Sequence, residues 1–248
     1  MLVAASTSCI LNAPLADILD RLADLEYTCA ELVIGENGVI KPEEVLPQFD
    51  SIVHLWRTQR RISPVAVYFD LDPTAENYVE LFRNVCQLAK AVKIVVITVR
   101  ASVPGTPFNE EIERLRFLTN AAMNHGVVVG LATESGRLAE SPDTIGSICK
   151  NVQGLGITLD PSHFIYNYPK PKDYESIMSR VCHLRLRDTS STQFQTRIGQ
   201  GTLEFGRLVL QLNKVNYRRA LCVDLAPLRD VDTFAELRKM RLLLESLL

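Results

Sequence analysis

The sequence predicts an α/β protein with the (β/α)₈ fold, a single TIM barrel formed by residues 1–248. Eight short apolar runs recur along the chain, and an amphipathic stretch follows each of them. Runs that are apolar throughout are typical of parallel strands that are covered on both faces. The length of 248 residues is close to the roughly 250 residues that this barrel usually takes. We therefore expect one domain, 1–248, and no second one.

The expected strands are taken from the apolar runs in chain order. They are Leu2 to Ile10, Thr28 to Asn37, Val65 to Asp70, Lys93 to Arg100, Val127 to Glu134, Leu155 to Asp160, Cys182 to Asp188, and Ala220 to Asp224. The fourth and fifth runs are rich in consecutive valine and isoleucine, which favours strands buried on both faces.

Helices are expected between the strands, where apolar residues recur at spacings of three and four. The clearest stripes are Leu15, Ile18, Leu19, Leu22 and Leu25; Tyr78, Leu81, Val85 and Leu88; Ile112, Leu115, Leu118 and Met123; and Phe234, Leu237, Met240, Leu243 and Leu244. Asn109 before two glutamates predicts the start of the third of these helices, and Gly126 predicts its end.

Composition and charge limit the classes of partner. The chain is 47% hydrophobic and 23% charged, and its formal net charge is −2. This balance is ordinary for a soluble globular protein and gives no basic field that would attract nucleic acid or an anionic membrane. No apolar segment is long enough to span a bilayer, and the N-terminus lacks the charged region of a secretory signal. We expect a cytoplasmic protein with a small-molecule substrate; the sequence indicates no oligomeric state.

The six cysteines lie inside strand or helix patterns without any C-x-x-C pair. They are expected to be reduced core residues. Cys9 is close to the end of the first run and could instead reach the rim of the barrel as a reactive thiol. Motifs for phosphate loops, dinucleotide binding and serine hydrolysis are absent, so the sequence supports none of these chemistries.

Polar residues gather at the carboxyl ends of the expected strands, where barrel active sites are built. They are Cys9, Asn37, Asp70, Arg100, Glu134, Asp160, Arg185 with Arg187, and Asp224. Barrel stability does not require charges at these positions. The three carboxylates of Glu134, Asp160 and Asp224 therefore predict either a divalent cation site or a site of proton transfer.

Four stretches resemble the sugar phosphate isomerase/epimerase group of xylose isomerase-like barrels. They are Leu131 to Glu134, Gly156 to His163, His183 to Asp188, and Ile198 to Gly201. In that family four residues after successive strands bind one divalent metal ion. The resemblance implies that Glu134 and Asp160 are two of the metal ligands. It also implies that His163 helps to hold the substrate beside the metal.

Two positions depart from the family pattern. The second histidine of the family's H-x-H motif corresponds to Arg185, and its last glutamate corresponds to Asp224. Arginine has no lone pair to donate and stays protonated, so it cannot replace an imidazole ligand. His183 lies two residues earlier, about 6.6 Å along the strand, which is a layer too deep. A metal bound by Glu134, Asp160 and Asp224 is weakened rather than excluded, and oxygen donors favour Mg²⁺ or Mn²⁺ over Zn²⁺.

Three functional hypotheses follow. In the first, the chain is an isomerase or epimerase of a small sugar, sugar phosphate or polyol-like carbonyl compound, with Glu134 and Asp224 as acid and base and His163 orienting a hydroxyl. In the second, a metal-free barrel binds a small anion without catalysis, and the Arg185 guanidinium pairs with Glu134 or Asp224 in place of the metal. In the third, Arg185 or Arg187 binds a substrate phosphate or carboxylate while the carboxylates still transfer protons.

Further candidates come from the loops. Glu140 follows Glu134 at a spacing that resembles ketose epimerases, and Arg197 is a candidate phosphate contact after the His183 to Asp188 stretch. His183 is a candidate substrate contact, or else a hydrogen-bonded core histidine; Arg187 could form only a strand-end ion pair with Asp188. The segment from Phe164 to Lys172 is expected to cover the pocket. Four histidines in all are too few for a multi-metal endonuclease site.

Overall fold

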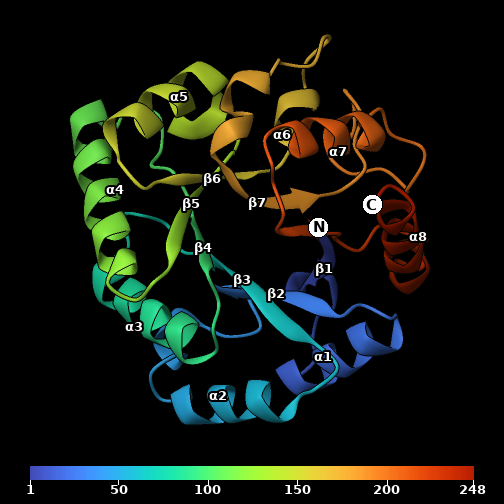
Figure 1. Cartoon of the computed structure of the whole chain (residues 1–248), viewed down its shortest axis with the longest axis horizontal. Coiled ribbons are helices and arrows are strands. Elements are labelled where there is room, and N and C mark those ends of the chain that lie inside the picture. Colours follow the sequence, from blue (N-terminus) through green and yellow to red (C-terminus); the bar gives the residue numbers. More distant parts are fainter.

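The computed structural model describes residues 1–248, which form a closed barrel of eight parallel strands in sequential order (Figure 1). The strands are β1 (Leu2–Ser6), β2 (Cys29–Gly35), β3 (Ser63–Asp70), β4 (Val96–Val99), β5 (Val128–Ala132), β6 (Gly156–Leu159), β7 (Val181–Leu186) and β8 (Ala220–Val223). β8 pairs with β1 and closes the barrel. The predicted (β/α)₈ fold is confirmed.

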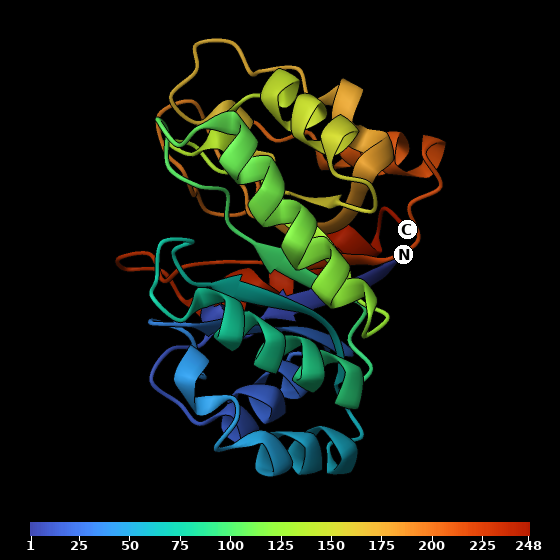
Figure 2. The ribbon, with the colours of Figure 1, turned by 90° about the vertical axis from the view of Figure 1, so that its left-hand side faces the viewer.

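The helices lie outside the strands and surround the barrel (Figure 1). They are α1 (Leu15–Asp24), α2 (Phe49–Thr58), α3 (Tyr78–Ala91), α4 (Phe108–Met123), α5 (Pro142–Asn151), α6 (Ser162–Ile165), α7 (Phe205–Lys214) and α8 (Thr233–Glu245). Four short 3₁₀ helices add to these: η1 (Thr7–Cys9), η2 (Pro42–Glu44), η3 (Leu138–Glu140) and η4 (Glu175–Arg180). In the side view, α3 and α4 run next to each other across the outer surface (Figure 2).

Several predicted boundaries were wrong by a few residues. The first strand ends at Ser6, because the Ser6 hydroxyl accepts a hydrogen bond from the Ser8 N–H and the chain turns into η1. The fourth strand begins at Val96, because Lys93 adopts a positive φ of 64° in the turn after α3. α4 begins at Phe108, directly after Pro107, and not at Asn109. Local turns moved these boundaries; the order of elements is as predicted.

In the core, the apolar faces of the helices pack against the outer surface of the barrel. Leu19, Leu22, Leu88, Leu115 and Leu118 are all completely buried in one apolar cluster. At about 25 cal/mol for each Å² of buried apolar surface, each leucine stabilises the fold by about 1.5–3 kcal/mol. The helices therefore hold the strand ends in place by packing.

All six cysteines are buried and free of disulfides, as predicted. The Cys9 thiol donates to the Val223 carbonyl and accepts from the Leu225 N–H. Burial raises the pKa of Cys9 to about 12, so the thiol is protonated and has a structural role. No helix combines the length and apolar character that crossing a membrane requires.

Candidate functional site

A cavity of about 130 Å³ opens at the carboxyl ends of the strands, which we call the mouth of the barrel. Strands β3, β5, β6 and β7 and the segments that follow them supply its lining. The lining residues are Tyr68, Ala132, Thr133, Glu134, Thr158, Asp160, His163, Arg185, Arg187 and Phe194. The structure thus brings together Glu134, Asp160, His163, Arg185 and Arg187, which the sequence singled out on separate segments.

Arg185 lines the mouth and is held there by three contacts. Its Nη2 atom lies 3.0 Å from Asp224 Oδ1, and its Nε atom lies 3.1 Å from Glu31 Oε1. The guanidinium carbon also lies 3.9 Å from the centre of the Tyr68 ring, which is a cation–π contact. Burial alone disfavours the charge, but Asp224 and Glu31 raise the pKa of Arg185 well above its usual value. A fixed positive charge is therefore built into the mouth.

Arg187 and Asp224 form the next part of the same ion-pair network. Arg187 Nη2 lies 3.0 Å from Asp160 Oδ2 and also contacts Asp224, whereas no ion pair joins it to Asp188. Asp224 accepts a further hydrogen bond from the Ser8 hydroxyl at 2.8 Å. Burial raises the pKa of Asp224, but Arg185 and Arg187 outweigh it and lower the value to about 2. Asp224 is thus ionised, is a poor proton acceptor and does not line the cavity.

Glu134 is held by a different arginine from the one expected. Arg100 Nε donates to Glu134 Oε2 at 3.0 Å and its Nη2 donates to Oε1, so the pair is bidentate. Arg100 also lies 3.4 Å from Asp70 Oδ1. Arg100 reaches Glu134 because β4 and β5 are neighbours in the barrel. Arg185 pairs with Asp224, one of its two predicted partners, and not with Glu134.

His163 is oriented by the loop after β5. Its Nδ1 atom accepts a hydrogen bond of 3.1 Å from the Ser135 N–H, which assigns the proton of the neutral ring to Nε2. Nε2 lies 3.9 Å from Asp160 Oδ2. Burial lowers the pKa of His163, so the ring is neutral at physiological pH. His163 therefore presents a hydrogen-bond donor to a ligand.

The acids of the mouth do not fit a divalent cation. Glu134, Asp160 and Asp224 each pair with an arginine, and Asp160 Oδ1 also accepts from the Ser162 N–H and hydroxyl. Only one group of three suitable side chains has ligand atoms within 4.8 Å of one another, and it is Glu31, His183 and Cys222, not the predicted set. The mouth therefore offers a guanidinium where the resemblance implies a metal.

Two predicted loop residues lie outside the cavity. Glu140 accepts from the Gly136 N–H at 2.9 Å and from the Tyr168 hydroxyl at 2.8 Å, so it joins the loops after β5 and β6. Arg197 is exposed, and it donates to the Asp230 carbonyl at 3.3 Å. Neither lines the mouth, because the loops direct both side chains toward neighbouring loops. In this structure Glu140 bridges two loops, and Arg197 lies at the surface.

His183 is buried beneath the mouth. Its Nε2 atom lies 2.8 Å from Glu31 Oε2. Of the two hypotheses for His183, a substrate contact or a hydrogen-bonded core histidine, the structure agrees with the second. Glu31 itself was not predicted as a site residue. Its signal in the sequence is a single charge inside the apolar run Cys29–Gly35.

Phe194, from the loop after β7, lines the cavity, whereas no residue of the segment Phe164 to Lys172 does. The Phe194 ring lies 4.8 Å from the His163 ring and 4.7 Å from the Arg187 guanidinium. Asp188 fixes this loop by accepting from the Gly199 and Gly201 N–H groups. A side chain at position 201 would collide with Asp188, so the loop requires glycine there.

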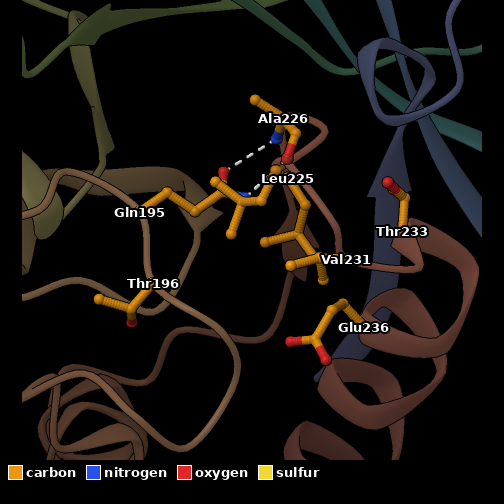
Figure 3. Close-up of a pocket in the computed structure, with 8 residues that line it drawn as sticks. Gln195, Thr196, Leu225, Ala226, Val231, Thr233 and Glu236 are labelled. Carbon is orange, nitrogen blue, oxygen red and sulfur yellow. Dashed lines mark hydrogen bonds between the residues drawn. The ribbon is translucent and has the colours of Figure 1, made fainter.

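A small pocket beside the mouth shows how the loops after β7 and β8 are joined (Figure 3). The Gln195 amide accepts from the Ala226 N–H at 2.8 Å and donates to the Ala226 carbonyl at 2.7 Å. Glu236 of α8 accepts from the Ile198 N–H. These contacts brace the loop that carries Phe194.

Comparisons with known proteins agree with the geometry of the fold. The family model described as xylose isomerase-like TIM barrel matches residues 19–241. The crystal structure of a D-tagatose 3-epimerase-like protein superposes with a TM-score of 0.78 at 19% identity, over 100% of this chain and 98% of the other. A 3-keto-D-glucoside 4-epimerase from E. coli gives 0.79 at 14% identity, over 99% of both chains.

A third similar structure contains a metal ion. A xylose isomerase-like TIM barrel protein from Mycobacterium smegmatis, in complex with magnesium, gives a TM-score of 0.77 at 13% identity, over 100% of this chain and 98% of the other. None of the curated proteins compared with the chain is similar in sequence. At such identities the structural likeness shows the fold alone. The family model nevertheless spans most of the sequence, and the chain belongs to the xylose isomerase-like TIM barrel family.

Proposed function

We propose that this chain is an isomerase or epimerase of a small sugar-like carbonyl compound and that Arg185 replaces the divalent metal in the mouth. One observation carries the proposal: the Arg185 guanidinium lines the cavity and is held between Asp224 and Glu31. A guanidinium is a permanent cation with several donors, and it can stabilise the oxyanion that forms when a proton leaves the carbon beside a carbonyl.

Proton transfer also needs a base, and Glu134 is the best candidate. It lines the cavity, and its side chain is 18% exposed to solvent. In an isomerisation Glu134 takes the proton from the carbon that bears the hydroxyl and returns it to the former carbonyl carbon. The hydroxyl proton moves to the other oxygen through hydrogen-bonded groups or water. His163 Nε2–H and Arg185 donate hydrogen bonds to the oxygens of the enediolate.

The charges of the lining favour an uncharged ligand. Arg185 and Arg187 are offset by Glu134 and Asp160, so the cavity carries no excess of either sign. One base also suits an isomerase better than an epimerase, because epimerisation requires proton transfer on both faces of the carbon. Asp224 is a poor second base because its pKa is about 2.

Binding without catalysis is a second candidate, favoured by one observation. Arg187 Nε is buried and has no hydrogen-bond partner within the chain. A buried donor without a partner is costly, and the carboxylate or phosphate of a small anion would satisfy it. In this case the ion pairs of the mouth serve recognition alone.

A proton-exchange experiment separates the two candidates. The full chain is incubated in D₂O with small aldoses, ketoses and their phosphate esters, without added metal, and NMR records product and deuterium at carbon. We expect turnover by the wild type and by Glu140→Gln, whose carboxylate lies outside the cavity. Glu134→Gln should lose at least about 100-fold, since general bases contribute 10²- to 10⁴-fold.

The remaining outcomes are equally informative. Ligand binding without turnover would reject the isomerase and support the second candidate. Turnover that requires added Mg²⁺ or Mn²⁺ would overturn the role of Arg185. Neither binding nor turnover across the panel would reject both candidates.

A further inference from the structure

A second cluster of polar side chains lies in the interior of the barrel, beneath the mouth. Glu31 of β2, His183 of β7 and Cys222 of β8 are at most 1% exposed. One ligand atom of each lies within 4.8 Å of those of the other two. None of the three transfers a proton or contacts the substrate in the proposed reaction; Glu31 contributes only as a partner of Arg185. The family resemblance assigns none of them as a metal ligand.

We propose that Glu31, His183 and Cys222 form a Zn²⁺ site that joins three strands inside the barrel. A thiolate, an imidazole and a carboxylate are all established zinc ligands, at about 2.3, 2.0 and 2.1 Å respectively. The soft thiolate selects Zn²⁺ over Mg²⁺, Ca²⁺ and Mn²⁺. Three protein ligands leave the fourth tetrahedral position for water.

The His183–Glu31 pair requires only a small adjustment. His183 Nε2 and Glu31 Oε2 are 2.8 Å apart, and two ligands of a tetrahedral zinc ion are about 3.3 Å apart. The pair must therefore open by about half an ångström to admit the ion. This movement is small for a glutamate side chain.

The charges of the cluster also balance. The two oxygens of Glu31 face different groups, because Oε1 lies 3.1 Å from Arg185 Nε and Oε2 faces His183. A cation between Oε2 and His183 leaves Oε1 to Arg185, which keeps its pair with Asp224. Glu31 and the Cys222 thiolate together neutralise Zn²⁺, and the thiol proton is released to solvent on binding. A cation in the mouth has no such arrangement.

An opening at the other end of the barrel reaches this cluster. A cavity of about 180 Å³ at the amino-terminal ends of the strands is lined in part by Cys182 and His183. Lys93 and Arg219 also line it and repel a cation on this path. Capture of the ion while the strands assemble avoids that barrier, as is common for sites that do not exist in the unfolded chain.

Refolding with metal tests the site. The full chain is unfolded, refolded with Zn²⁺ or Co²⁺, desalted and analysed for metal. We expect about one retained equivalent, and we expect the Co²⁺ form to show the near-ultraviolet thiolate-to-cobalt charge-transfer band. Cys222→Ser should lose the band and most of the metal. Cys149→Ser is the matched control, because Cys149 is buried in α5, away from the cluster.

The wild-type measurement decides the proposal even if Cys222→Ser fails to fold. Retained Co²⁺ without a thiolate band, retention of less than a tenth of an equivalent, or equal retention by Cys222→Ser would each overturn it. None of these readouts depends on turnover, so failure of the zinc site and failure of the proposed reaction are distinguishable.

Discussion

The two sides of the mouth use the same pairing of arginine with carboxylate in different surroundings. On the side of β6 to β8, the paired side chains of Arg185, Arg187, Asp160 and Asp224 are 7–12% exposed. On the side of β3 to β5, the paired side chains of Arg100, Asp70 and Glu134 are 18–34% exposed. Charges screened by water exchange partners more easily than buried ones. The first side therefore serves as a fixed cation site, and the second can engage a ligand.

The carboxyl groups of the two sides also differ in their pKa. Two buried guanidinium groups lower the pKa of Asp224 to about 2 despite its burial. Asp70 shares the single Arg100 with Glu134, and burial raises its pKa. Two guanidinium groups thus outweigh burial at Asp224, whereas burial prevails at Asp70.

The largest expected effect is that of Asp224→Asn on stability. The change leaves Arg185 and Arg187 without their shared partner, and breaking a buried pair costs about 3–5 kcal/mol. Asp70→Asn on the more exposed side should cost less than about 1 kcal/mol. Urea unfolding of both variants measures the difference. Equal losses of unfolding free energy in the two variants would show that the ion pairs on the two sides of the mouth contribute equally to stability.

Strong acid should weaken the buried side through Asp224. Its folded pKa of about 2 lies below the ordinary 3.8, so its stabilising contribution is complete above pH 3.8 and is lost as the pH falls toward 2. A shift of this size corresponds to about 2 kcal/mol. The free energy of unfolding should therefore fall less steeply between pH 4 and 2 in Asp224→Asn than in the wild type. Parallel pH profiles would rule out this contribution.

Arg100→Met should have an intermediate effect, of about 1–2 kcal/mol, since the pair with Glu134 is neither fully exposed nor fully buried. The variant also frees Glu134 from its bidentate partner. When both effects are expressed as free energies, we expect a larger change in turnover than in the free energy of unfolding. Arg116→Met, which removes an exposed pair with Glu113 on α4, is the control. If Arg100→Met lost no more stability than this control, the Arg100–Glu134 pair would not be the stabilising, partly buried pair described here.

The smallest effect concerns His163. Burial lowers its folded pKa below 6.5, so the unfolded chain binds protons more readily and stability falls as the pH drops below 6.5. His163→Asn should flatten the stability profile between pH 6.5 and 5. NMR titration of the imidazole in the wild type provides the independent check, and a midpoint at or above 6.5 would contradict a buried neutral ring.

The fold and the site were predictable to different degrees. Apolar periodicity determines the order of strands and helices, and the shared rim of a parallel barrel brings Glu134, Asp160 and Arg185 together. Which charged side chains pair depends on how far each one reaches across to a neighbouring strand. The apolar periodicity of the sequence carries no information about this. Arg100 therefore appeared only as a polar strand end, although it holds Glu134.

Loop residues were the least predictable. Glu140 and Arg197 follow strand ends in the sequence, as site residues do, but the direction of a loop side chain depends on contacts that form only in the folded chain. The opposite case is Glu31, whose isolated charge in a buried strand marks a polar interior without naming its partners. Its two partners, His183 and Arg185, could be identified only from the three-dimensional structure.

A Mn²⁺ titration of the full chain, followed by EPR of the free ion, tests whether Arg185 replaces a metal in the mouth. With the guanidinium between Asp224 and Glu31, we expect the wild type to leave Mn²⁺ free at millimolar concentration. Stoichiometric binding that Asp160→Asn abolishes would place a cation in the mouth and contradict the replacement.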